Sequence, residues 1–180
     1  MMLRKVIIAV VVVLMIVGGY FLINYIRNER NLINFANIIE NDTWDDLTLT
    51  IYYMSLFTLT PLPLQIEDVM RIGDRIVVSG EELRAHADLL IQLDNANQAF
   101  ARRSSRAQAR IYYVFEYANR RTFSVVFWDL EPGYMVVNSR MIEHDMAFYD
   151  VIIPFLPEYI VQQLRSILKP ILIDAMPDKE

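Results

Sequence analysis

Residues 111–128, IYYVFEYANRRTFSVVFW, decide the fold. The stretch contains two runs of β-branched and aromatic residues, which are the residue types that favour β-strands. A polar break of hairpin length, residues 118–121, separates the two runs. Side chains alternate between the two faces of a strand. One face therefore collects Ile111, Tyr113, Phe115 and Tyr117 from the first run and Phe123, Val125 and Phe127 from the second. The stretch predicts an antiparallel hairpin with an apolar core face.

The opposite face of this hairpin is apolar as well, because it carries Tyr112, Val114, Val126 and Trp128. A second apolar face is either covered by a helix or open to a partner. We expect a helix to cover this face, and an open binding surface is the alternative.

Further strands are expected on both sides of the hairpin. Residues 47–53 alternate in the way that is typical of a half-buried strand. The prolines of TPLPLQ, residues 60–65, end this strand because proline removes a backbone donor from the ladder. Residues 75–78 form a short second strand, and YMVVN, residues 134–138, follows the turn EPG as the last strand of a meander.

Two main helices are expected. SGEE, residues 79–82, matches a capping box, in which the serine and the glutamate each bond a free backbone N–H group of the other. A helix should therefore run from about residue 80 to residue 96. A second helix should begin at Pro157 and end before Pro170. The sequence thus predicts an α+β fold, an antiparallel meander with two helices packed on one face.

Residues 6–26 form an apolar segment of 21 residues without a charge. As a helix it is about 31 Å long, and the hydrocarbon core of a bilayer is about 30 Å thick. A cleaved signal peptide is the alternative, but bulky side chains follow Gly18 and Gly19 and leave no small-residue cleavage site. We therefore expect an uncleaved N-terminal transmembrane helix.

The flanking charges predict its orientation. Arg4 and Lys5 precede the segment, and the two arginines that follow it are partly offset by Glu29. The positive-inside rule then favours a single-pass protein of the cell membrane with a cytoplasmic N-terminus. The expected organisation is a cytoplasmic N-terminus at 1–5, a transmembrane signal anchor at 6–26, a juxtamembrane stalk at 27–46 and an extracytoplasmic α+β domain at 47–180.

Charge and cysteine content exclude several classes of function. Residues 1–30 hold four basic residues and one acidic residue of the chain's 17 and 22, so the remainder carries a net charge of −8. A domain this acidic is a poor general binder of nucleic acid, because the phosphate backbone requires positive charge at the contact. The chain has no cysteine, which excludes disulfides, thiolate metal sites and a lipoprotein anchor.

His86 and His144 are the only histidines. Glu143 and Asp145 flank His144, but a stable metal site needs three or four converging ligands, and we expect a solvated turn there. We expect His86 to be partly buried and hydrogen-bonded beside the apolar stripe of its helix. The chain shows no nucleophile elbow and no glycine-rich phosphate loop. We therefore expect no catalytic, cofactor or metal site.

The segment ARRSSRAQAR, residues 101–110, holds four arginines in a chain that is acidic overall. Arg102, Arg106 and Arg110 would align along one helix stripe, with Arg103 beside them. Two more, Arg120 and Arg121, lie at the tip of the predicted hairpin. We expect a solvated connection. The functional alternative is contact with anionic lipid headgroups, wall polymers or an acidic partner, where each basic residue contributes about 1 kcal/mol.

RIYYVFE, TFSVVFWDL and FYDVIIPFLP resemble the corresponding segments of a family of small extracytoplasmic bacterial domains. The resemblance covers roughly residues 47–170, and the segments that carry it are hydrophobic structural motifs. Members of the family are anchored by a lipid or by a single span, and no activity is assigned to them. The resemblance therefore implies the location and the fold. This chain lacks the anchoring cysteine of lipoprotein members, which leaves the span as its anchor.

Together these features predict a membrane-anchored extracytoplasmic accessory or interaction domain without enzymatic activity. It would bind a surface partner or an anionic component of the cell envelope. A structural subunit of a membrane assembly, of the secretion or division type, is the first alternative. A cell-surface enzyme is the second.

Overall fold

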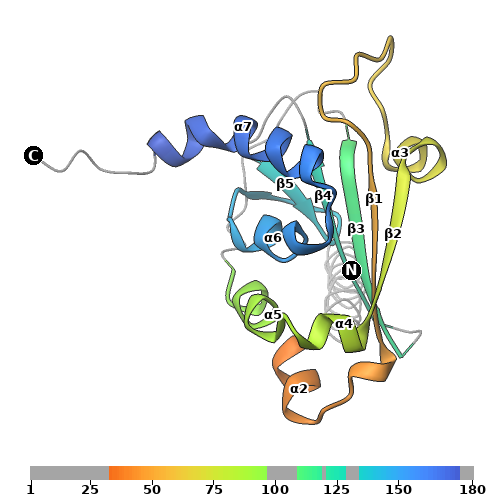
Figure 1. The fold of residues 1–180 in the computed structure, drawn as a ribbon, viewed down its shortest axis with the longest axis vertical. Helices are drawn as coiled ribbons and strands as arrows, with labels where there is room; N and C mark the ends of the chain where they lie inside the picture. The colour runs from red at the N-terminus through yellow and green to blue at the C-terminus, as the bar shows by residue number, and fades with distance from the viewer. Residues whose placement is uncertain (1–32, 97–108, 119–120, 129–133, 175–180) are drawn as a thin grey trace, which may run out of the picture. The chain divides into compact units, whose positions relative to one another are not determined.

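The structure, a computed structural model, describes residues 33–96, 109–118, 121–128 and 134–174. A compact unit begins at Ile33 (Figure 1). The expected cytoplasmic N-terminus and transmembrane segment lie outside the described residues. Within the described ranges, no helix combines the length and the apolar character needed to cross a membrane.

The predicted α+β fold with an antiparallel sheet is confirmed. Six strands lie in the order β2-β1-β3-β4-β5-β6, and every neighbouring pair is antiparallel. The strands are β1 (Leu47–Tyr53), β2 (Asp74–Ser79), β3 (Ala109–Tyr117), β4 (Arg121–Trp128), β5 (Tyr134–Val137) and β6 (Arg140–Glu143).

The last strand, β6, is absent from the sequence prediction. A two-residue turn joins it to β5, and both turn residues, Asn138 and Ser139, have positive φ angles of 47° and 65°. This left-handed backbone suits a tight hairpin, but it is usually signalled by Asn-Gly or Asp-Gly. Asn138 stabilises the turn, because its side-chain oxygen accepts a hydrogen bond from the Ser124 N–H group at 2.9 Å.

The core face of the sheet is the face that the alternation predicts. Tyr113 and Phe115 are fully buried, and the Tyr113 hydroxyl donates to the carbonyl oxygen of Phe148 at 2.9 Å. The ring of Phe35 meets the ring of Phe115 edge to face, with centroids 4.9 Å apart. Because aromatic rings fill this layer, the core buries a large apolar area, and the buried Tyr113 hydroxyl has a hydrogen-bond partner.

More helices contribute to this core than the two that were predicted. They are α2 (Phe35–Glu40), α5 (Ala87–Asp94), α6 (Ala147–Asp150) and α7 (Glu158–Asp174), all on the same side of the sheet (Figure 1). The expected stalk, residues 27–46, is wrong from Ile33 onward, because Phe35 and Ile38 of α2 and Trp44 belong to the core. Asp94 also accepts a hydrogen bond from Ala36 N–H at 2.8 Å and so joins α5 to α2.

The helix predicted over residues 80–96 is two helices, α4 (Gly80–Arg84) and α5, with a break at Ala85 and His86. The predicted capping box is present, since Ser79 N–H donates to the Glu82 carboxylate at 2.8 Å and Glu82 N–H donates to the Ser79 hydroxyl at 3.4 Å. A Cβ atom on Gly80 would collide with the backbone carbonyl of Trp44. Glycine is therefore required where α4 crosses the 3-10 turn at Trp44–Asp46.

The last helix, α7, differs from the sequence prediction at both ends. The Pro157 carbonyl accepts the first helical N–H bond, from Ile160 at 2.9 Å, so the proline precedes the helix. The helix also continues past Pro170 to Asp174, because a proline removes one backbone donor without necessarily ending a helix. A 3-10 turn, Ile153–Phe155, leads into this region from α6.

Candidate interaction surface

The face of the sheet opposite the core carries the candidate site, and we call it the outer face. Strand register places Arg75, Tyr52, Tyr112 and Val126 in one row across β2, β1, β3 and β4. The short helix α3 (Ile66–Ile72) covers one end of this face, where its Val69 packs with Ala109 and Val126. The expected covering helix is therefore present over only part of the face.

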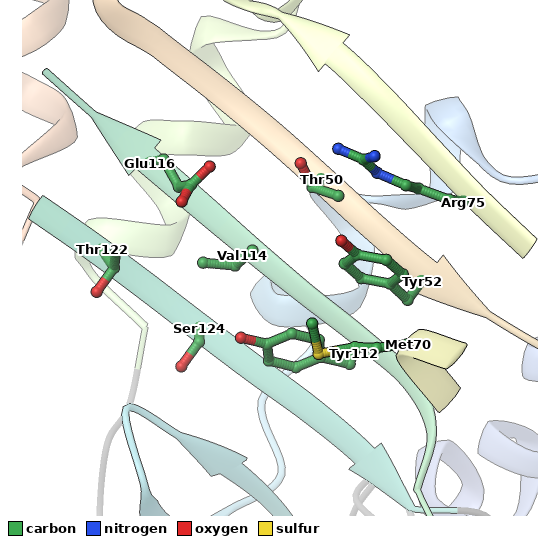
Figure 2. Close-up of a pocket in the computed structure, with 9 residues that line it drawn as sticks. All are labelled: Thr50, Tyr52, Met70, Arg75, Tyr112, Val114, Glu116, Thr122 and Ser124. Carbon is green, nitrogen blue, oxygen red and sulfur yellow. The ribbon is translucent and has the colours of Figure 1, made fainter. Parts of the chain in front are cut away.

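Beside α3 the outer face forms an open hollow of about 310 Å³ (Figure 2). Its centre is a pair of stacked rings, Tyr52 and Tyr112, whose centroids lie 6.0 Å apart at an interplanar angle of 18°. The Arg75 guanidinium lies 5.7 Å from the centroid of the Tyr52 ring, within the range of a cation–π contact. The remaining lining residues are Thr50, Met70, Val114, Glu116, Thr122 and Ser124. The hollow thus combines aromatic rings with hydroxyl groups, as small binding sites do.

The hollow contains one basic and one acidic residue, Arg75 and Glu116. Burial, followed by the neighbouring Tyr52 and Glu116, raises the pKa of Tyr112, so this hydroxyl remains a hydrogen-bond donor at neutral pH. Arg75 and Glu116 are both exposed. Among the described residues, neither forms an ion pair. The hollow therefore presents one positive and one negative group to whatever binds there.

Exposed apolar side chains are concentrated in one stretch of the chain, and one of them, Met70, lines the hollow. Six of the eight large hydrophobic residues that are exposed in the described part of the chain fall between residues 57 and 77. They lie on the loop between β1 and α3, on α3 itself and on β2, and Leu59 is 97% exposed. We call these six the outer cluster: Phe57, Leu59, Leu62, Met70, Ile72 and Val77.

The loop that carries half of the outer cluster, residues 54–65, is held at several points. Arg110 Nη2 donates to the Thr58 carbonyl oxygen at 2.7 Å, and Arg110 Nη1 lies 3.6 Å from Met54 Sδ. The Gln163 side-chain oxygen of α7 accepts a hydrogen bond from Leu56 N–H at 2.8 Å. Ala109 N–H donates to the Leu64 carbonyl oxygen at 3.0 Å. The apolar side chains are therefore displayed on a fixed backbone.

Arg110 corrects one sequence prediction, because it is 2% exposed and does not belong to a solvated arginine stripe. Ala109 pairs with Trp128 and Ile111 with Phe127, so Arg110 is the extra residue of a β-bulge. A bulge redirects the side chain at its position, and here it buries the guanidinium under the loop. The helical spacing to Arg102 and Arg106 does not extend to it, since Arg110 lies in a strand.

The prediction for the other candidate arginines is not tested, because their side chains lie outside the described part of the structure. Arg102, Arg103, Arg106 and Arg120 lie outside the described residues. Arg121 begins β4, and only its backbone is described.

The two histidines lie away from the hollow. His144 is not in a solvated turn: its Nε2 atom is buried without a hydrogen-bond partner, and burial lowers its pKa. Its ring centroid lies 5.1 Å from that of Tyr149. His86 lies at the break between α4 and α5, partly buried as expected, with its ring edge to face with Phe155 at 5.2 Å. In the described ranges, no three acidic or histidine side chains converge as a metal site would require.

Sequence reasoning missed the outer cluster, although a signal was present. LFTLTPLPL, residues 56–64, contains five large apolar residues, two prolines and no charge, which is unusual for a surface loop. The prolines were interpreted only as the end of a strand. Comparison of the chain with family models, with curated proteins and with solved structures finds no match.

Proposed function

We propose that this chain is a single-pass, membrane-anchored interaction domain on the extracytoplasmic side of a bacterial membrane, without enzymatic activity, and that it binds a protein partner through the outer face. One observation carries the proposal: the outer cluster is concentrated on β2, α3 and the loop before α3, and it shares Met70 with a hollow lined by aromatic and hydroxyl groups. Single exposed apolar residues are ordinary on protein surfaces, but a contiguous group of them marks a contact site.

The loop anchors support binding. Association costs conformational entropy when a flexible loop must be ordered. The bonds from Arg110 to Thr58 and from Leu56 to Gln163 fix the loop before a partner arrives. Leu59 and its neighbours can therefore bury apolar area at about 25 cal/mol per Å² without a large ordering penalty.

The membrane anchor rests on the sequence. Residues 6–26 are long and apolar enough to cross a bilayer, and the preceding basic residues favour an external domain. The resemblance to small extracytoplasmic bacterial domains supports the same location. A structural subunit of a membrane assembly would use the same outer face. The geometry supports binding over catalysis, since the hollow contains a single acid, Glu116, and neither histidine.

Contact with an anionic envelope component is a second candidate. The arginine-rich segment joins β3 at Ala109, whose N–H group bonds to the foot of the loop at Leu64. Its test is binding of the full chain to anionic polymers or headgroups after Arg102, Arg103 and Arg106 are changed to glutamine. Unchanged binding and unchanged salt dependence would reject this candidate.

The protein-binding proposal can be tested in intact cells. A photo-crosslinking residue is placed in the full chain at Ile72 or Val77, and at Ile91 as a matched control, because Ile91 is an exposed apolar residue on α5. We expect a discrete protein adduct from the first two positions and none from the third. No adduct at Ile72 and Val77, or equal adducts at all three positions, would contradict the proposal.

A further inference from the structure

We propose that the partner of the outer face is a second copy of this chain, related to the first by a two-fold axis that passes over Thr50. This inference rests on the proposed protein-binding function and names its partner. It is carried by the placement of charge on the outer face, and the proposed membrane anchor supports it.

The charges of the hollow are arranged for self-pairing. Arg75 of β2 lies in the row of Tyr52 and Tyr112, and Glu116 of β3 lies two rows away, opposite Thr48. Thr50 lies on β1, the strand between β2 and β3, and its row lies between the row of Arg75 and the row of Glu116. The three residues therefore lie on a diagonal of the sheet with Thr50 at its centre. From the strand spacing and the rise per residue, the Cα atoms of Arg75 and Glu116 are about 16 Å apart.

This distance exceeds the combined reach of the two side chains, which explains why they form no ion pair within one copy. A second copy turned by a two-fold axis through the middle of the diagonal would place its Glu116 over Arg75 and its Arg75 over Glu116. Each of the two charges would then meet the opposite charge of the other copy, which gives two ion pairs in one interface. A two-fold interface requires this property, since the same patch must complement itself.

Two copies held in one membrane by the proposed anchor would be confined to a plane, and this confinement would raise their effective concentration for one another.

A charge-exchange experiment tests the pairing. The mass of the full chain is measured in detergent micelles by light scattering for wild type, Arg75→Glu, Glu116→Arg and the double variant. We expect a dimer for wild type, a loss of affinity of about tenfold or more for each single variant, and recovery in the double variant. Arg165→Glu, an exposed charge reversal on α7, is the matched control and should leave the dimer intact.

Recovery in the double variant shows that the single variants lose affinity because the Arg75–Glu116 pairing is broken, and not for another reason. Dimerisation through residues 6–26 alone would leave all variants dimeric, and a dimer that does not pair Arg75 with Glu116 would leave the folded double variant impaired. Either result overturns the inference. Circular dichroism and thermal unfolding of each variant establish that the fold is retained.

Crosslinking of single thiols gives an independent readout, because the chain has no cysteine of its own. Val77→Cys in membranes is treated with a short bis-maleimide, because Val77 lies opposite Thr50 and so beside the proposed axis. Ile91→Cys is the control. A covalent dimer of two 21.1 kDa chains at Val77, and not at Ile91, supports the inference. If the photo-adducts from Ile72 or Val77 contain a different protein and no thiol dimer forms, self-association is wrong while the protein-binding function stands. If neither experiment gives an adduct, both fail.

Discussion

Arg110 Nη2 donates a hydrogen bond to the Thr58 carbonyl oxygen at 2.7 Å, across 52 positions of sequence. The contact joins a bulge in β3 to the loop that follows β1. A buried guanidinium is costly unless its donors are satisfied. The position of Arg110 is therefore a structural one, and the shape of the exposed apolar loop depends on it.

Replacement of Arg110 by methionine should destabilise the domain by about 2 kcal/mol or more, because a charged hydrogen bond under the loop is lost. Urea unfolding measures the change, and amide hydrogen exchange should increase between residues 54 and 65. Arg84→Met is the matched control. Arg84 is half exposed and pairs with Asp42 at the surface, so its loss should cost less than about 1 kcal/mol. Equal effects of the two substitutions would show that burial of Arg110 has no special role.

Gly80→Ala should be among the most damaging small substitutions in the chain. The added methyl group would meet the backbone carbonyl of Trp44, which cannot rotate away as a side chain could. Overpacking of this kind costs about 3 kcal/mol. Ser79→Ala, at the adjacent residue, removes only a helix cap and should cost about 1 kcal/mol. Thermal unfolding of both variants gives the comparison, and a smaller effect at Gly80 than at Ser79 would refute the close contact.

His144 should make stability depend on pH in mildly acidic solution. Burial lowers its pKa below the ordinary value of 6.5, so the unfolded chain binds a proton more readily than the folded chain. At high pH His144 is neutral in both states and its burial makes stability no more pH-dependent. As the pH falls below 6.5 toward the lower pKa of the folded state, the free energy of unfolding decreases. His144→Phe should remove this part of the dependence. Urea unfolding between about pH 5 and about pH 8 measures it, and an unchanged slope in the variant would assign the dependence to other groups.

The expected topology can be measured with one thiol. Ser104→Cys introduces a single cysteine into the arginine-rich segment, since the natural chain has none. We expect a membrane-impermeant maleimide to label this position in intact cells, because Arg4 and Lys5 favour a cytoplasmic N-terminus. Labelling only after lysis would reverse the orientation. The arginines would then have to be considered as a cytosolic site for anionic lipid, RNA or an acidic protein.

Local patterns predicted the parts of the fold that depend on neighbours in sequence. The alternation in residues 111–128 identified the hairpin and its core face, and SGEE identified the start of α4. Residues 33–46 were misjudged because a helix of six residues leaves too short a pattern to separate a stalk from a core element. The strand β6 was missed because its turn, Asn-Ser, lacks the usual glycine.

The candidate site could not be predicted in the same way. Arg75, Tyr52 and Tyr112 come from three strands, and only the register of β2, β1 and β3 brings them into one row. Arg110 is a second case, because one extra residue in β3 reverses the direction that spacing alone would assign to its side chain.

The position of β1 between two neighbouring strands has a mechanical consequence. The described domain begins at Ile33, near one end of β1, and the apolar loop leaves the other end. A tension applied between a membrane anchor and a partner on the loop would run along this strand. Ladder hydrogen bonds to β2 and β3 lie perpendicular to the pull on both sides, so they would be loaded together in shear rather than opened one at a time. The domain should therefore transmit force between its two ends with unusual resistance to unfolding.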